Sequence, residues 1–193
     1  SWVRRTVRDT GETKYHDNAW GDFDGDGVEE FMAWNQNGQQ LLLFDVPADP
    51  RNAGPWPVTP IFSWTGGFND EYDGAAVVDI NLDGKDDIVG GFGWVEHVAG
   101  TDYVVREINP DNLYRYARTV AGQVVPGGRP EIVCVLERAT RDLLIYLWTG
   151  TDWEIRTVLP SVPRSHSLQL GDIDQDGNLD IITGELGETE PFD

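Results

Sequence analysis

Cysteine, methionine and basic side chains are scarce in this sequence. Its 193 residues include one cysteine, one methionine and three histidines, and 14 lysines and arginines stand against 34 aspartates and glutamates. The resulting net charge of −20 would be repelled by nucleic acids and by anionic membranes, so neither is expected as a partner. No apolar run is long enough to cross a bilayer, so insertion into a membrane is not expected either.

Helical periodicity and the common catalytic motifs are also missing. No long stretch repeats apolar residues with the period of a helix, and 22 glycines and 11 prolines interrupt the chain. There is no nucleophile motif, phosphate-binding loop or zinc-type spacing of histidine and cysteine. Cys134 lies in an apolar run and is expected to be a small buried side chain. Because 39% of the residues are apolar, we expect one folded domain over residues 1–193, of the all-β class.

One acidic nine-residue pattern occurs three times, at residues 22–30 (DFDGDGVEE), 79–87 (DINLDGKDD) and 172–180 (DIDQDGNLD). Each copy has a carboxylate or amide at positions 1, 3 and 5, a glycine at position 6 and an acid at position 9. Alternate residues of a tight loop point inward, so these oxygens and the carbonyl of position 7 can converge on one point. Oxygen ligands of this kind suit calcium, and we expect about three ions.

The predicted calcium ligands are Asp22, Asp24, Asp26, Val28 and Glu30 in the first loop, Asp79, Asn81, Asp83, Lys85 and Asp87 in the second, and Asp172, Asp174, Asp176, Asn178 and Asp180 in the third. Acidic turns that hold no metal are the competing interpretation, which three copies in the same context make improbable. An EF-hand is rejected because position 12 is Ala33, Gly90 or Thr183 in place of glutamate, and because the flanking residues read as strands.

Longer repeats surround these loops. A fourth copy at residues 123–131 keeps a glycine at position 6 and an acid at position 9 but lacks the other ligands, so it is interpreted as a turn that lost its metal. An aromatic residue followed by β-branched positions recurs at 2–7, 56–61, 103–108 and 153–158, which is typical of strands. The repeats therefore run approximately over 15–63, 72–108, 115–159 and 165–193, with an outer strand at 1–8. Four antiparallel strands per repeat predict a β-propeller, with a shorter third strand in the second repeat.

The acidic loop followed by an apolar strand resembles the FG-GAP repeat, also called the VCBS-type repeat, which builds the propeller of integrin alpha subunits and of many secreted bacterial proteins. The match is close at 172–184, good at 22–34 and 79–91, and only in outline at 123–136. The resemblance implies a calcium-binding propeller in an extracellular, secreted or cell-surface setting, with roles such as cell adhesion. Glu30 at position 9 departs from the commoner aspartate of the family.

The ends of the chain leave the blade number open. The outer strand at 2–7 can complete the last blade, which gives a closed four-bladed ring. Alternatively the chain is part of a larger propeller, for example a seven-bladed one, or it self-associates through open strand edges. The sequence begins at Ser1 without a signal peptide, so a mature form or an excerpt of a longer protein is expected.

Polar residues at the starts of the inner strands are the candidate ligand-binding residues. His16, Asp73, Arg118 and His166 would surround the mouth of a central channel and bind a carbohydrate or protein ligand. His16 and His166 occupy the same repeat position and are also weak catalytic candidates, together with Tyr15 and Tyr72, for a polysaccharide lyase. The competing interpretation is that both histidines are strand-start residues held by backbone groups. Binding or assembly is favoured, with a lyase or a structural subunit as alternatives.

Overall fold

The computed structural model describes residues 2–12, 14–52, 54–65, 72–90, 93–108, 117–136 and 140–185, and over these ranges all regular secondary structure is β. The first sheet contains β1 (Tyr15–Gly21), β2 (Glu30–Asn35), β3 (Gln40–Phe44) and β4 (Val58–Ser63). The second contains β5 (Ala76–Val78), β6 (Asp87–Gly90), β7 (Gly93–Ala99) and β8 (Asp102–Glu107). The third contains β9 (Ala117–Gly122), β10 (Glu131–Leu136), β11 (Arg141–Trp148) and β12 (Trp153–Val162), and β13 (Ser165–Gly171) pairs with β14 (Asp180–Glu185).

Each sheet is a simple antiparallel meander. Strands follow one another in sequence order, β1-β2-β3-β4, β5-β6-β7-β8 and β9-β10-β11-β12, and the last two strands form a two-stranded sheet. Every acidic loop joins the first strand of its sheet to the second. This confirms the expected all-β class and the expected antiparallel sheets of four strands.

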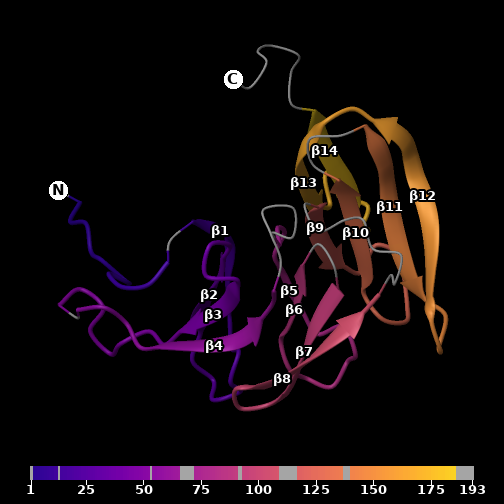
Figure 1. Cartoon of the computed structure of the whole chain (residues 1–193). Coiled ribbons are helices and arrows are strands. Elements are labelled where there is room, and N and C mark those ends of the chain that lie inside the picture. Colours follow the sequence, from indigo (N-terminus) through magenta and orange to yellow (C-terminus); the bar gives the residue numbers. More distant parts are fainter. Residues whose placement is uncertain are drawn as a thin grey trace.

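The four sheets follow one another along an open arc (Figure 1). Their first strands are the neighbours, since β1 contacts β5, β5 contacts β9 and β9 contacts β13. The first sheet and the β13–β14 pair lie at opposite ends of the arc (Figure 1). The strands that the structure describes therefore do not close into a four-bladed ring, which was one of the expected arrangements.

The N-terminal segment differs from the expectation. Residues 2–12 contain no strand, and the backbone N–H of Trp56 donates to the carbonyl of Val7 at 2.8 Å. Val7 packs with Trp56 and Phe31 against the first sheet, which is why the segment does not complete the last one. The third strand of the second repeat is also not the shorter one, because β7 has seven residues and β3 has five.

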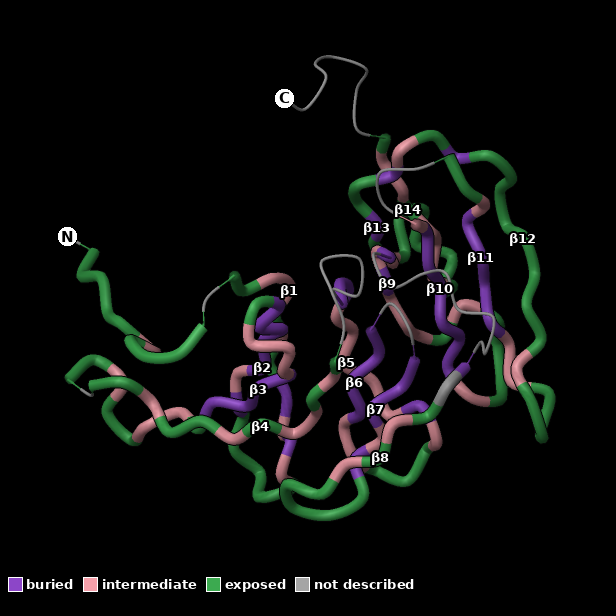
Figure 2. Tube along the Cα trace, viewed as in Figure 1, coloured by how far each residue is buried: buried purple, intermediate pink, exposed green. Residues whose placement is uncertain are grey.

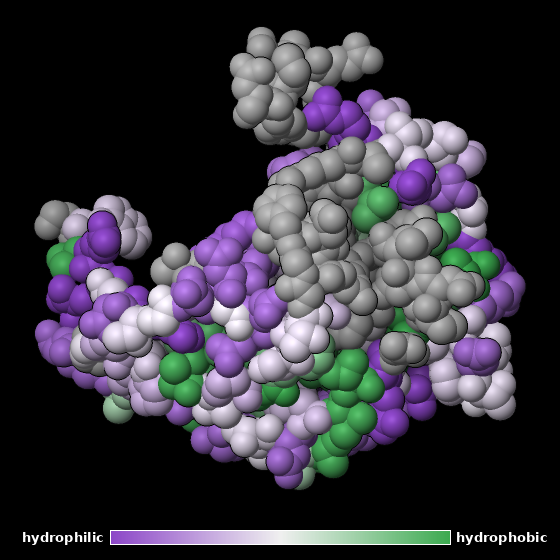
Figure 3. Space-filling model, in the orientation of Figure 1, coloured by the Kyte–Doolittle hydropathy of each residue, from purple (hydrophilic) through white to green (hydrophobic). Residues whose placement is uncertain are grey.

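Apolar clusters fill the spaces between neighbouring sheets. Trp34 and Leu41 of the first sheet pack with Ile88 of the second, and corresponding clusters join the second sheet to the third and the third to β13. Buried positions accordingly lie mainly on the strands, whereas most positions of the connecting loops and of β12 are exposed (Figure 2). Apolar side chains also gather on the surface over β7 and β8 (Figure 3). Cys134 is buried as expected.

Candidate functional site

The three acidic loops share one hydrogen-bond pattern. The carboxylate at position 1 accepts the N–H of the glycine at position 6, at 3.0 Å in the first loop, 2.7 Å in the second and 3.0 Å in the third. The acid at position 9 accepts the N–H of position 2, at 2.8, 3.1 and 2.9 Å. The position-7 residues Val28, Lys85 and Asn178 each donate their N–H to the position-5 carboxylate.

A left-handed backbone at position 6 makes this pattern feasible. Gly27, Gly84 and Gly177 have φ angles of 89°, 88° and 91°. Only glycine adopts such angles without strain, so the glycine at this position is required by the turn itself. The loops are thus one structure repeated, as the spacing of the sequence predicts.

Two of the loops bring three carboxylates within 4.8 Å of one another, a separation that could hold a metal ion. These groups are Asp22, Asp24 and Glu30, and Asp172, Asp174 and Asp180. The second loop has the amide of Asn81 at position 3, and Lys85 Nζ pairs with Asp83 at 2.8 Å. The ammonium group of Lys85 therefore forms an ion pair with Asp83, which the sequence predicts to be a calcium ligand.

The fourth loop shows what replaces the ligands. Gln123 stands at position 1, and its side-chain amide donates to the carbonyls of Val125 and Gly127. Glu131 at position 9 still accepts the N–H groups of Val124 and Val125, each at 2.9 Å. A side-chain donor therefore lies where the other loops present acceptors, in agreement with a turn that has kept its backbone and lost its ligand set.

Burial and mutual repulsion raise the pKa of two acids at position 9, Asp87 and Glu30. Burial raises the pKa of Asp87 to about 6, although its carboxylate accepts the N–H groups of His97 and Ile80. Burial and the neighbouring Asp24 also raise the pKa of Glu30, against the hydrogen bond from Phe23. These carboxylates are held in place but lack a compensating positive charge, which a bound cation would provide.

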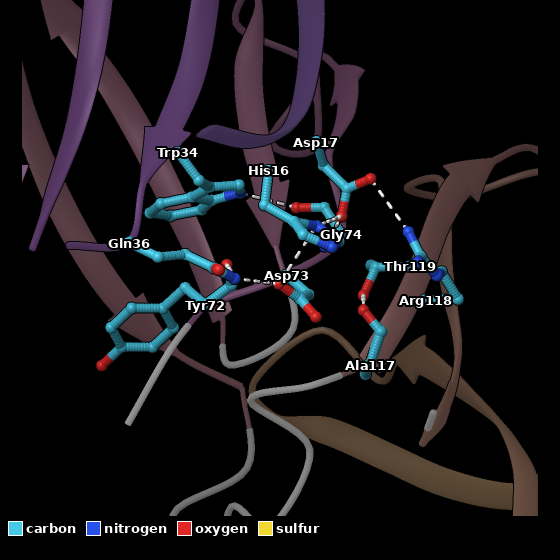
Figure 4. Close-up of polar contacts among 10 residues, drawn as sticks. All are labelled: His16, Asp17, Trp34, Gln36, Tyr72, Asp73, Gly74, Ala117, Arg118 and Thr119. Atoms are coloured by element: carbon cyan, nitrogen blue, oxygen red, sulfur yellow. Dashed lines mark hydrogen bonds and ion pairs between the residues drawn. The ribbon is translucent and has the colours of Figure 1, made fainter. Parts of the chain in front are cut away.

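A second group of polar side chains lies at the N-terminal ends of the first strands of three sheets, next to the C-terminal end of β2 (Figure 4). His16 Nδ1 lies 3.1 Å from Asp17 Oδ2 and 3.2 Å from Asp73 Oδ1. Arg118 of β9 pairs with Asp17 Oδ1 at 2.9 Å, and Gln36 donates to Asp73. We refer to His16, Asp17, Gln36, Asp73 and Arg118 as the His16 cluster, and it joins the first three sheets.

A β-bulge in β1 allows consecutive residues to reach the same cluster. The pairing of β1 with β2 shifts between His16 and Asn18, and Asp17 has a φ of 24°. In a regular strand His16 and Asp17 would point to opposite faces. The bulge turns Asp17 so that its carboxylate also accepts the N–H of Gly74 at 2.6 Å.

Charge pairing shifts the titration of this cluster. The hydrogen bond to Asp17 raises the pKa of His16 against the opposing effect of burial, and the charge of Asp73 adds to the rise. Burial alone would raise the pKa of Asp17, but hydrogen bonds from His16 and Gly74 and the charge of Arg118 outweigh it and lower that pKa. The cluster thus favours a protonated imidazole between two carboxylates.

The structure brings together three of the four predicted ligand-binding residues, His16, Asp73 and Arg118. Asp17 and Gln36 belong to the same cluster, although the sequence did not predict either of them as a ligand-binding residue. His166 lies on β13, where it is the residue left out of the ladder by a register shift between Ser165 and Ser167. In β1 the corresponding omitted residue is Asp17, so His16 and His166 do not occupy equivalent positions in their ladders.

The two predicted tyrosines have different surroundings. Tyr72 is buried, with its ring stacked on Trp34 at 5.6 Å and edge-on to Trp64 at 4.6 Å. Tyr15 is exposed, and its ring lies 6.4 Å from that of Phe44. Tyr116 precedes the loop at 123–131 by seven residues, as Tyr15 and Tyr72 precede theirs, and it lies outside the described residues.

A cavity between the first and second loops was not foreseen. It measures about 440 Å³, and its lining includes Asp22, Asp24, Lys85, Asp86 and His97. The His97 ring is buried and stacks on Tyr103 at 5.0 Å. No sequence signal identifies this residue, because a single histidine within a strand has no partner at a fixed spacing.

Comparisons with known proteins support the fold alone. No protein-family model matches the sequence, and a search of curated proteins found no match. A solved structure of an Agrocybe aegerita lectin, described as recognising non-reducing terminal N-acetylglucosamine, matches with a TM-score of 0.59 and 17% sequence identity. The match covers 89% of this chain and 47% of the lectin, so the chain spans about half of the lectin's length. The fold is therefore lectin-like, and the FG-GAP family is not shown by these comparisons.

Across the described ranges there is no helix long and apolar enough to cross a membrane.

Proposed function

We propose that this chain is a calcium-stabilised segment of a β-propeller that binds carbohydrate outside the cell or at its surface. The observation that carries the proposal is the lectin-like arrangement of antiparallel sheets around adjacent first strands. Each four-stranded sheet would be one blade, with approximate repeats at 15–63, 72–108, 115–159 and 165–193. The open arc of Figure 1 favours a propeller of more than four blades, of which the chain supplies a part.

Calcium would bind in the three acidic loops and stabilise the connection between the first and second strands of each sheet. The hydrogen bonds that the three loops share support this assignment, and in the first and third loops three carboxylates lie within 4.8 Å of one another. Binding in the folded state alone adds to the free energy of unfolding. Weak sites of this kind are filled at the millimolar calcium concentrations found outside cells, which agrees with the proposed location.

The His16 cluster and His166 are the proposed contacts for a carbohydrate. His16, Asp17 and Arg118 are each partly exposed, with 28%, 23% and 17% of the side chain accessible, and they offer donors and acceptors for hydroxyl groups. The lyase alternative gains no support, because Tyr72 is buried among aromatic rings. Association of chains through open strand edges remains the structural alternative, and the mass of the native particle in calcium would detect it.

A calorimetric titration with N-acetylglucosamine in calcium tests the proposal, with a glycan array to identify other sugars. We expect saturable sugar binding that is weakened in an Arg118→Ala variant and retained in Arg51→Ala, an exposed arginine far from the cluster in the sequence. Absence of binding to every sugar on the array would refute carbohydrate recognition.

A further inference from the structure

We propose that His16, Asp17 and Asp73 bind one zinc-class divalent cation, at a site separate from the acidic loops. The three side chains offer one nitrogen and two oxygen atoms that all lie within 4.8 Å of one another. This inference requires neither calcium in the loops nor a bound carbohydrate.

The distances within the group fit tetrahedral coordination. In a tetrahedral zinc site with bonds of about 2.0 Å, neighbouring ligand atoms lie about 3.3 Å apart. His16 Nδ1 lies 3.1 Å from Asp17 Oδ2 and 3.2 Å from Asp73 Oδ1. The distances from Nδ1 to the two carboxylate oxygens therefore need to lengthen by only a few tenths of an ångström to accept the ion.

The hydrogen-bond count of His16 supports a ligand at this point. Nδ1 carries at most one hydrogen, yet it faces two carboxylate oxygens at nearly equal distance. One hydrogen cannot point at both acceptors at once, so in the metal-free protein Nδ1 donates to only one of the two oxygens. A cation bound at this position contacts both oxygens at once, and its binding releases the Nδ1 proton.

Gln36 provides a second, independent indication. Its side chain is 4% exposed and extends to Asp73, where Nε2 donates to Oδ1 (Figure 4). Among the described residues its Oε1 has no hydrogen-bond partner, although this oxygen is buried. A buried amide oxygen without a partner is costly, and a cation or a cation-bound water beside Asp73 would supply one.

Neighbouring groups already orient the proposed ligands. Arg118 holds Asp17 Oδ1 at 2.9 Å, and the N–H of Gly74 donates to Oδ2 at 2.6 Å. Hydrogen bonds of this kind to ligating carboxylates fix their orientation in metal sites. Three protein ligands leave a fourth position open, which is the arrangement of zinc sites that bind an exogenous group.

The donor set distinguishes this site from the acidic loops. The loops offer oxygen atoms only, which suit calcium, whereas an imidazole nitrogen with two carboxylates favours zinc and related divalent ions. Zinc is therefore expected to bind the His16 cluster when the loops are already saturated with calcium.

The test is a titration of zinc chloride into the untagged protein in excess calcium, at a pH above the pKa of His16. We expect one zinc ion per chain, no measurable binding in His16→Gln, and a loss of about 10-fold in affinity in Arg118→Gln, which removes only an orienting contact. His166→Gln is the matched control and should bind zinc as the parent does.

Cobalt provides a spectroscopic readout of the coordination geometry. The parent protein should show the intense visible absorption of tetrahedral Co²⁺, and Asp73→Asn should weaken it. Melting curves in calcium establish that each variant is folded, and if His16→Gln does not fold, the Asp73→Asn titration decides. No saturable zinc binding by the parent, or equal binding by the parent and the folded His16→Gln or Asp73→Asn variant, would overturn the proposal. Neither outcome bears on sugar binding, which is measured separately.

Discussion

Replacing Asp87 with alanine tests how the acid at position 9 stabilises a loop. The Asp87 carboxylate is fully buried and accepts two backbone N–H groups, from His97 at 2.8 Å and from Ile80 at 3.1 Å. Each hydrogen bond to a charged acceptor contributes about 1.5–3 kcal/mol, and alanine would leave both donors buried without a partner. Since burial of the charge opposes part of this gain, we expect Asp87→Ala to lower the free energy of unfolding by about 3–5 kcal/mol in chelator.

Calcium adds a second effect at the same residue. A site filled at 10 to 100 times its dissociation constant stabilises the fold by about 1.4–2.7 kcal/mol, and Asp87→Ala should lose this contribution as well. Urea unfolding followed by tryptophan fluorescence, in calcium and in chelator, measures both terms.

Glu131→Ala is the matched control because Glu131 also accepts two N–H groups, from Val124 and Val125, in the loop that lacks the other ligands. It should be destabilised by a similar amount in chelator, with no additional loss in calcium. The reasoning is refuted if Asp87→Ala stays within about 1 kcal/mol of the parent in chelator, since the two bonds alone predict more. The assignment of calcium to this loop fails if both variants lose the same calcium-dependent stability.

Three further predictions concern the whole chain. Chelation of calcium should remove about 4–8 kcal/mol from three loops together and lower the melting temperature by about 8–30 °C, as measured by calorimetry, with magnesium as the control ion. Without calcium, stability should rise as the pH falls through about 6, because Asp87 binds its proton more tightly when folded than unfolded and His16 also has a raised pKa. With calcium the slope should reverse, since acidification releases the ions, and parallel slopes in the two conditions would contradict this. Trp34→Phe should cost about 1–3 kcal/mol in urea unfolding because the indole N–H donates to the buried carbonyl of Gly74 at 2.8 Å, whereas the half-exposed Trp20 should tolerate the same change.

The acidic loops could be predicted because their chemistry is local. Aspartate, asparagine and glycine at fixed offsets set the turn within nine residues, and the apolar run that follows sets the strand. The structure accordingly has the same hydrogen bonds in loops 57 and 93 residues apart. The metal itself is not part of this confirmation and stays a prediction.

The His16 cluster could be predicted only in part because it depends on tertiary structure. Asp17 joins it through a bulge that no residue of β1 signals, and the partner that fixes its carboxylate is Arg118, which is 101 residues away. Alignment of the repeats placed His16 and His166 together, but the shift in the β13 ladder gives His166 a different position. A register change of one residue is enough to redirect a side chain.

Tertiary contacts also explain the two errors in the strands. The N-terminal pattern is typical of a strand, but its backbone pairs with Trp56 only through the carbonyl of Val7 and forms no ladder among the described residues. The third strand of the second repeat was expected to be shorter, but β7 runs from Gly93 to Ala99 and includes Glu96 and His97. Both are accommodated, since Glu96 pairs with Arg106 at 2.7 Å and the His97 ring stacks on Tyr103.

The most direct test of the calcium-stabilised fold is the number of calcium ions bound per chain, measured by equilibrium dialysis in the presence of magnesium. The account predicts about three ions, reduced by one in each of Asp22→Ala, Asp79→Ala and Asp172→Ala, and unchanged in Gln123→Ala. Binding of no calcium, or a stoichiometry that none of the three aspartate variants alters, would contradict it.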